Sequence, residues 1–112
     1  MNLDSIEVTI LRNLVFNEEF LRKVVPFMKS EYFENINQKI IFEEVVNFVQ
    51  QYNKPVTKEI LCIEIEKRSD INDSVFQEIT KLISYFEDDK SEFEWLVDTT
   101  EKWCRDRAIY LA

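Results

Sequence analysis

Carboxylates are the side chains in this sequence with the greatest capacity for chemistry, because 22 of the 112 residues are Asp or Glu. Glu31 and Glu34 lie close together, and Glu43 and Glu44 follow a short distance along the chain. Paired carboxylates can perform acid–base catalysis or hold Mg²⁺ when a pocket shifts their pKa values. These four fall on segments with amphipathic spacing, where acidic side chains usually face water. The sequence therefore predicts no catalytic or metal site at these positions.

Histidine and glycine are both absent from the chain. Histidine is the commonest general base and metal ligand, and glycine allows the backbone to approach phosphate in Walker-type and dinucleotide-binding loops. The two cysteines, Cys62 and Cys104, lack metal-ligand spacing, so we expect reduced thiols, with Cys62 a small core residue. We predict no catalytic, cofactor-binding or metal-binding residue, and we expect that this chain is not an enzyme.

The charge balance limits the class of partner. Fourteen basic and 22 acidic residues give a net charge of −8, whereas duplex DNA is held by Lys and Arg side chains that displace phosphate counterions. We therefore expect little direct DNA binding. No apolar run approaches the ~20 residues of a membrane span, and Asp4 and Glu7 interrupt any signal peptide at the N-terminus. These features predict a soluble cytoplasmic protein without a membrane partner.

Apolar residues recur at helical spacing in six segments, which predicts an all-α fold, a compact orthogonal bundle of about six helices. The helix at 36–52 is apolar on more than one side and is the expected central helix. Leu61, Ile63 and Ile65 alternate as in a strand, but a lone strand would have no partner, so a helix is expected there too. The expected helices cover residues 5–15, 17–25, 36–52, 57–67, 73–86 and 91–112.

Short polar breaks separate these segments. Pro26 is expected to kink the chain or begin a fresh turn, and residues 30–35 are expected to form a turn with one helical twist. Five of the six expected helices have a residue that can cap the N-terminus, in two cases with a Glu in the capping-box position three residues on. The expected caps are Asp4 with Glu7, Asn17, Thr57, Asn72 or Asp73, and Ser91 with Glu94.

The last helix, Ser91–Ala112, differs from the others. Leu96, Trp103 and Tyr110 follow a spacing of seven with Thr99 between them, while Trp95, Val97 and Ile109 lie off that stripe. No Gly, Asn or Pro ends the helix. We therefore expect the chain to be part of a longer protein.

Lys102, Arg105 and Arg107 form a local basic cluster on this helix. They could contact an acidic neighbour or nucleic acid. Alternatively, they complement the negative C-terminal half of the helix, with Glu101 and Arg105 as an i,i+4 pair.

Four local motifs, in order along the chain, resemble the N-terminal domain of DnaB-type replicative DNA helicases, most closely the T-even-like phage group. Residues 25–28 lead into 30–34 (Ser-Glu-Tyr-Phe-Glu), which resembles a short acidic-aromatic motif of the phage members. Ile41-Phe42 is followed by a helix that ends in Tyr52. The last two motifs are Lys54-Pro55-Val56-Thr57, a Pro-Val turn into a helix, and Trp95 followed by Glu101-Lys102 and Arg107. Gln38-Lys39 stands where bacterial members usually carry a His-Arg pair.

The resemblance implies that 1–112 is a helicase N-terminal (collar) domain, with a globular head at 1–90 and the start of a helical hairpin at 91–112. The ATPase motor would follow Ala112 and is absent from this chain. Such collars self-associate as dimers within a hexameric ring and dock primase and the helicase loader. The location would then be the cytoplasm of a phage-infected host cell.

Protein–protein contact is the expected chemistry of the last helix, because aromatic residues and Arg are enriched at interfaces. The alternative for the two Trp residues is packing in the domain's own core. A free-standing acidic phage adaptor or inhibitor, including a protein that mimics DNA, is the alternative function. The spread of acidic residues over every helix argues against mimicry. The candidate protein-interface residues are Trp95, Thr99, Trp103, Arg107 and Tyr110.

Overall fold

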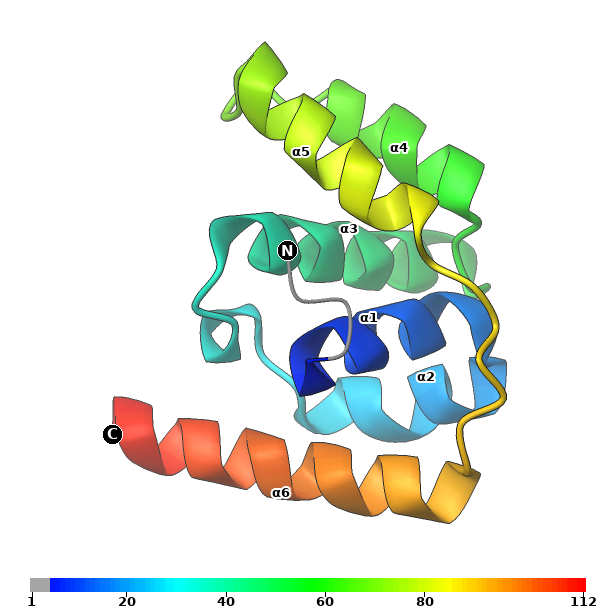
Figure 1. The fold of residues 1–112 in the computed structure, drawn as a ribbon, viewed down its shortest axis with the longest axis vertical. Coiled ribbons are helices and arrows are strands. Elements are labelled where there is room, and N and C mark those ends of the chain that lie inside the picture. Colours follow the sequence, from blue (N-terminus) through cyan, green and yellow to red (C-terminus); the bar gives the residue numbers. More distant parts are fainter. Residues whose placement is uncertain (1–4) are drawn as a thin grey trace.

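The computed structural model describes residues 5–112, and every regular element in that range is helical. The predicted all-α fold with six helices is confirmed. The expected Asp4 cap lies outside the described residues. In chain order the elements, shown in Figure 1, are α1 (Ile6–Phe16), α2 (Glu18–Val24), the 3₁₀ turns η1 (Val25–Phe27) and η2 (Ser30–Tyr32), α3 (Ile36–Tyr52), α4 (Lys58–Glu66), α5 (Asp73–Ser84) and α6 (Phe93–Leu111).

Three of the predicted N-caps are confirmed by hydrogen bonds from backbone N–H groups of the first helical turn. The Phe20 N–H donates to Asn17 Oδ1 at 3.0 Å. The Ile60 N–H donates to Thr57 Oγ1 at 3.2 Å. Asn72, rather than Asp73, caps α5, because its Oδ1 accepts from the Val75 N–H at 2.8 Å. Local sequence therefore sets where these helices begin.

The cap of α6 differs from the prediction. Glu92, not Ser91, is the N-cap, and its carboxylate accepts from the N–H groups of Glu94 at 3.2 Å and Trp95 at 2.6 Å. A carboxylate has two oxygens for two donors, and its charge favours the positive end of the helix. Ser91 instead donates its N–H to Asp89 Oδ1 at 3.0 Å.

The core is organised around α3, as its apolar faces predicted. This helix packs against α1, α4, α5 and η2, and Figure 1 shows it between the α4–α5 pair and the α1–α2 pair. The Cα radius of gyration of 13.3 Å matches the ~13 Å of a compact 100-residue domain. The largest fully buried side chains come from all six α-helices and from the segment after α5: Phe20, Phe86, Ile10, Leu11, Leu14, Leu21, Ile41, Leu61, Ile65, Ile79, Ile83 and Leu96.

Arg68 ties the α4–α5 pair to the central helix. Its guanidinium lies 3.2 Å from Glu43 and 3.0 Å from Glu44 of α3, and 2.7 Å from Asp70 of its own loop. The hydrogen bond with Asp70, together with those from Glu43 and Glu44, raises the pKa of Arg68 further above its ordinary value. Two of the carboxylates considered for catalysis are therefore partners in an ion network that joins helices.

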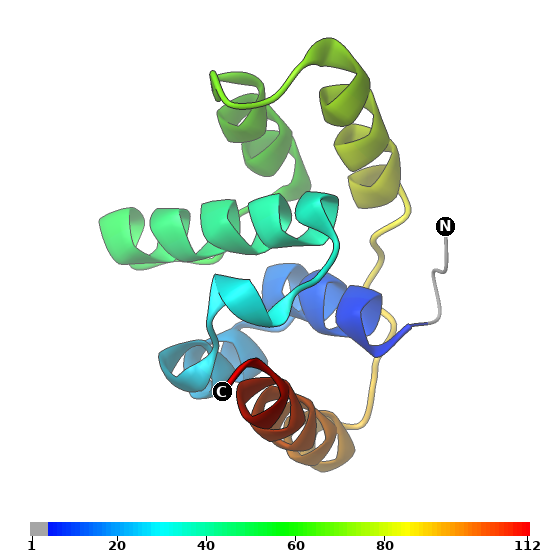
Figure 2. The ribbon, with the colours of Figure 1, turned by 90° about the vertical axis from the view of Figure 1, so that its left-hand side faces the viewer.

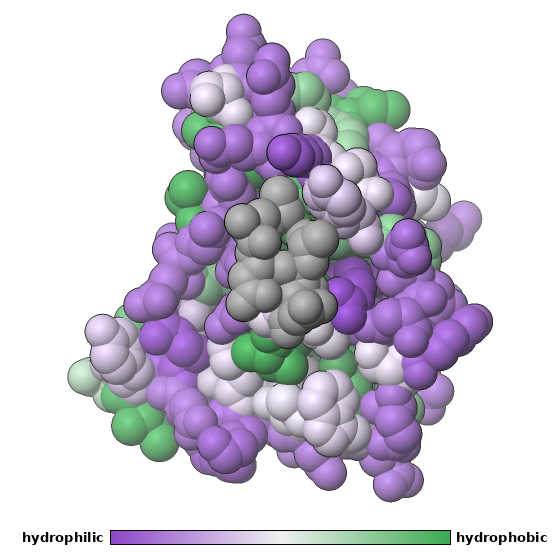
Figure 3. Space-filling view, viewed as in Figure 1, coloured by the Kyte–Doolittle hydropathy of each residue, from purple (hydrophilic) through white to green (hydrophobic). Residues whose placement is uncertain are grey.

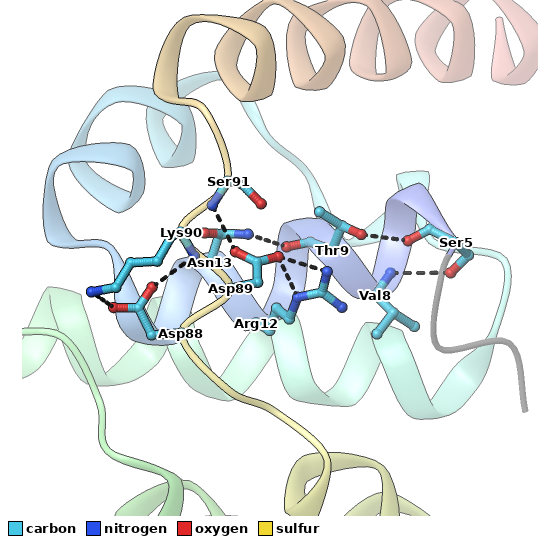
Figure 4. Close-up of polar contacts among 9 residues, drawn as sticks. All are labelled: Ser5, Val8, Thr9, Arg12, Asn13, Asp88, Asp89, Lys90 and Ser91. Atoms are coloured by element: carbon cyan, nitrogen blue, oxygen red, sulfur yellow. Dashed lines mark hydrogen bonds and ion pairs between the residues drawn. The ribbon is translucent and has the colours of Figure 1, made fainter.

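The connection from α5 to α6 runs along α1 and is fixed there by an ion pair (Figure 4). Arg12 of α1 meets Asp89 with its Nε at 2.7 Å and an Nη at 2.6 Å from the carboxylate. Lys90 next to it has the left-handed φ of 55°, which turns the chain towards α6. The predicted acidic break at 87–89 is thus a surface connection, and one of its carboxylates positions the last helix.

Candidate protein interface

The N-terminal half of α6 packs on the domain, whereas its last two turns project from it. Leu96, Val97, Thr100 and Cys104 are buried, and α6 contacts α1, α2 and η2. Beyond Cys104 the helix has no buried residue. Figure 1 shows the C-terminal end of α6 extending past the other helices, and in Figure 2 this end points towards the viewer.

The buried face of α6 is not the predicted stripe with a spacing of seven. Val97, expected off the stripe, is 5% exposed, and Tyr110, expected on it, is 72% exposed. A straight α-helix drifts about 20° per seven residues, so a stripe with that spacing turns away from the core. The core instead follows the spacing of Leu96, Thr100 and Cys104.

The prediction that Cys62 is a core residue is wrong, and the buried cysteine is Cys104. Burial, followed by the nearby charge of Glu101, raises the pKa of Cys104 to about 12. Cys62, expected in the core, is half-buried at its edge, and burial raises its pKa in the same direction.

Trp103 joins α6 to two distant segments of the chain. Its indole N–H donates to Glu7 Oε2 of α1 at 3.1 Å. Its ring lies 4.9 Å from the ring of Phe33 and meets Tyr32 edge-on at 6.2 Å, measured between centroids. This half-buried indole thus contributes to the domain's own packing, which was the alternative prediction for it. Any role in an interface remains a prediction.

Arg107 forms the last polar attachment of α6 to the body. Its Nε–H donates to the backbone carbonyl of Tyr32 at 2.7 Å, and its guanidinium lies 4.9 Å from the centre of the Tyr110 ring. A cation over an aromatic face is attractive. Arg107 therefore fixes the helix on one side and supports the exposed Tyr110 ring on the other.

The expected ion pair between Glu101 and Arg105 does not form. Lys102 and Asp106 pair instead, with Nζ 3.1 Å from the carboxylate, and Arg105 makes no ion pair with any residue of the range 5–112. Exposed i,i+4 pairs contribute little, so their spacing in the sequence does not determine whether they form.

Three of the candidate interface residues share one side of α6. At 100° per residue, Trp95, Thr99 and Tyr110 lie within about 60° of one another around the helix axis. Trp95 is 53% exposed and Thr99 is half-buried. Ile109, at 69% exposure, extends this strip at the projecting end. We call these four residues the α6 face.

The α6 face is one of several places where large apolar side chains are exposed, and Ile109 and Tyr110, at 69% and 72%, are the most exposed of them in the part of the chain that the structure describes. Figure 3 shows mostly hydrophilic side chains, with apolar residues in small separate patches, one of them near the end of α6. Over residues 5–112, no three Cys, Asp or Glu side chains gather in a way that could hold a metal ion. No helix in that range is long and apolar enough to cross a bilayer. At 100° per residue, the exposed Lys102–Asp106 ion pair lies on this same side of α6, between Thr99 and Ile109. The surface therefore offers apolar contact at its two ends and charge between them.

Comparison with known proteins relates the chain to a replicative helicase. No family model matches the sequence. Over 103 residues, the chain is 32% identical to the DnaB-like replicative helicase of Enterobacteria phage T4. The aligned stretch covers 92% of this chain but only 22% of that helicase, so the chain spans about one fifth of the relative's length. The resemblance predicted from the ordered motifs is confirmed.

Proposed function

We propose that this chain, which is related over nearly its whole length to about one fifth of a DnaB-like replicative helicase, is the N-terminal collar domain of such a helicase. In this proposal the domain serves ring assembly and partner docking, and a separate ATPase motor performs the catalysis. The observation that carries the proposal is the 32% identity over 92% of the chain. The all-α fold is consistent with it.

A passive role is supported by how the charged side chains are used. Glu43 and Glu44 are held by Arg68, and Asp89 is held by Arg12. These carboxylates position helices. The sequence also lacks the glycine-rich loop that cradles nucleotide phosphates. ATP hydrolysis is therefore assigned to the motor of the parent protein.

Self-association is assigned to the α6 face. Trp95, Ile109 and Tyr110 expose apolar surface on a helix whose end leaves the domain, and aromatic residues dominate the energetics of protein interfaces. In the parent helicase, this face would pair neighbouring subunits and build the collar of a hexameric ring.

Docking of primase and helicase loader is the second role that we propose for the collar, in the cytoplasm of a phage-infected cell. The net charge of −8 suits protein partners better than DNA, because phosphates are repelled by an acidic surface. Contact with DNA is left to the motor.

Sedimentation of the full-length parent protein tests the assembly role. Ile109→Ala with Tyr110→Ala should weaken ring formation, because both side chains are largely exposed in the isolated domain. Tyr85→Ala is the matched control, since Tyr85 is 50% exposed and lies at the end of α5. Rings that stay as stable as the wild type in the α6 variant would refute the assignment of this face. ATP hydrolysis by the isolated chain would refute the passive role.

A further inference from the structure

Helix α6 is an outer layer of the domain, on the side of α1 and α2 that faces away from α3 (Figures 1 and 2). It packs on α1, α2 and η2, which we call its seat. The other helices hold together without it, since α3 contacts α1, α4 and α5, and α1 contacts α2. Among the largest fully buried side chains of residues 5–112, Leu96 is the single contribution of this 19-residue helix.

Thr100 is a polar defect in the contact between α6 and its seat. It lies between Leu96 and Cys104 in the buried row of the helix and is 0% exposed, yet its Oγ1 has no hydrogen-bond partner within residues 5–112. A hydroxyl that is removed from water without a partner loses hydrogen bonds, and it regains them when the surfaces separate. The seat therefore holds α6 less firmly than an apolar residue at this position would allow.

The connection that leads into α6 is fixed at its near end and open at its far end. Phe86 is 1% exposed, and its carbonyl oxygen accepts from Lys58 Nζ at 2.9 Å. Asp89 is held on α1 by its ion pair. Residues 90–92 are exposed or half-buried and lie outside any helix, and Lys90 has the left-handed φ of 55°. A pivot for α6 is therefore available at 90–92.

We propose that α6 is a hinged arm, weakened at Thr100, that leaves its seat as a unit by pivoting at residues 90–92 while α1 to α5 stay folded. Opening breaks the polar contacts of Trp103 and Arg107 with the body and returns the Thr100 hydroxyl to water. Such local opening costs less free energy than global unfolding when a segment makes few buried apolar contacts. The arm changes the direction in which the α6 face points, and it does so whichever partner that face binds.

Cys104 reports the opening, because its thiol is buried against the seat and reacts when it is exposed. The variant Cys62→Ser leaves Cys104 as the one thiol of the chain. Its modification by Ellman's reagent at pH 8 is measured at urea concentrations below the unfolding transition. The logarithm of the rate should rise with urea at about a tenth to a half of the slope of global unfolding, because opening exposes less surface. A slope of zero, or one equal to that of global unfolding, would overturn the proposal.

Substitutions inside and outside the seat separate opening of the arm from global unfolding. Trp103→Phe removes the indole hydrogen bond to Glu7 and should speed the modification of Cys104 about fivefold. Arg68→Ala destabilises the whole domain by breaking the ion network on α3, but it should leave the rate within about twofold, because the network lies outside the seat. A rate that rises with Arg68→Ala as much as the global unfolding constant rises would overturn the proposal.

A matched pair of threonine substitutions tests the defect itself. Thr100→Val replaces the unpaired hydroxyl with a methyl group of similar size and should slow the modification of Cys104 about fivefold or more. Thr99→Val makes the same change at the half-buried neighbour and should alter the rate by less than about twofold. Both variants keep the volume of the side chain, so the fold is preserved. Equal rates in the two variants would overturn the proposal.

Discussion

Replacing Trp103 by Ala should destabilise the domain strongly, because this indole joins α6 to α1 and to the segment after η2. The substitution removes the ring contacts to Phe33 and Tyr32 and the hydrogen bond to Glu7. It leaves a gap beside residues that are themselves buried, Tyr32 at 7% and Phe33 at 3% exposure. The packing of α6 on the body depends on these contacts.

The size of the effect follows from the half-buried position of Trp103. Truncation of a fully buried Trp to Ala costs about 3–5 kcal/mol, so a half-buried ring should cost about 2 kcal/mol. The lost hydrogen bond adds about 1 kcal/mol. For a domain of this size, a total of about 3 kcal/mol lowers the Tm by about 13 °C. Trp103→Phe keeps an aromatic ring and should lose only about 1 kcal/mol.

Thermal and urea unfolding, followed by far-UV circular dichroism, measure both variants. Trp95→Ala is the matched control on the same helix, because Trp95 is 53% exposed and its loss should change stability by no more than about 0.5 kcal/mol. A Trp95→Ala variant that is as unstable as Trp103→Ala, or a Trp103→Ala variant that melts like the wild type, would refute the assignment of Trp103 as the anchor.

Three further substitutions or treatments test other parts of the structure. Arg68→Ala should lower the free energy of unfolding in urea by about 1–3 kcal/mol, because it leaves the partly buried Glu44 without its cationic partner. Lys67→Ala, at an exposed pair, should lower it by less than about 0.5 kcal/mol, and equal losses would contradict the ion network. Asn53→Ala should be about 1 kcal/mol less stable than Asn53→Gly, because the φ of 55° is left-handed, and equal melting temperatures would argue against that backbone. Ellman's reagent at pH 8 should modify Cys62 well before Cys104, whose burial raises its pKa to about 12. The Cys104 thiol loses its proton at lower pH in the unfolded chain than in the folded one, so the free energy of unfolding should also fall as the pH rises above the ordinary thiol pKa of 9.0.

The features that sequence alone predicted were those set by local chemistry. Asn17 and Thr57 cap helices because a side-chain oxygen meets a backbone N–H three residues on, and that geometry depends on few neighbours. The apolar residues on more than one side of α3 likewise predicted its central position. The helix predicted in spite of the strand-like alternation at Leu61, Ile63 and Ile65 is confirmed, and Ile63 is 54% exposed on it.

The features that sequence missed depend on contacts between distant segments. Arg68 carried no motif, and its partners Glu43 and Glu44 lie 25 and 24 residues away. The bond between Trp103 and Glu7 spans 96 residues. The predicted buried side of α6 was wrong. The helices on which α6 docks determine which side is buried, and the spacing of residues within α6 carries no information about them. The burial of Cys104 could not be predicted either, because it depends on the same docked face of α6.

The candidate interface was only partly accessible to sequence reasoning. The aromatic content of the last helix pointed to Trp95 and Tyr110, and both are exposed. Trp103 and Arg107 were grouped with them, but the structure uses both to attach α6 to the body. Distinguishing an anchor from an exposed contact requires the position of the partner segment, here Tyr32 and Phe33.

The coding sequence beyond codon 112 tests the assignment to a replicative helicase most directly. The account predicts that the reading frame continues and encodes, a hundred or more residues downstream, an ATPase motor with the glycine-rich phosphate-binding loop that this chain lacks. A stop codon directly after Ala112, or a continuation without such a motor, would contradict it.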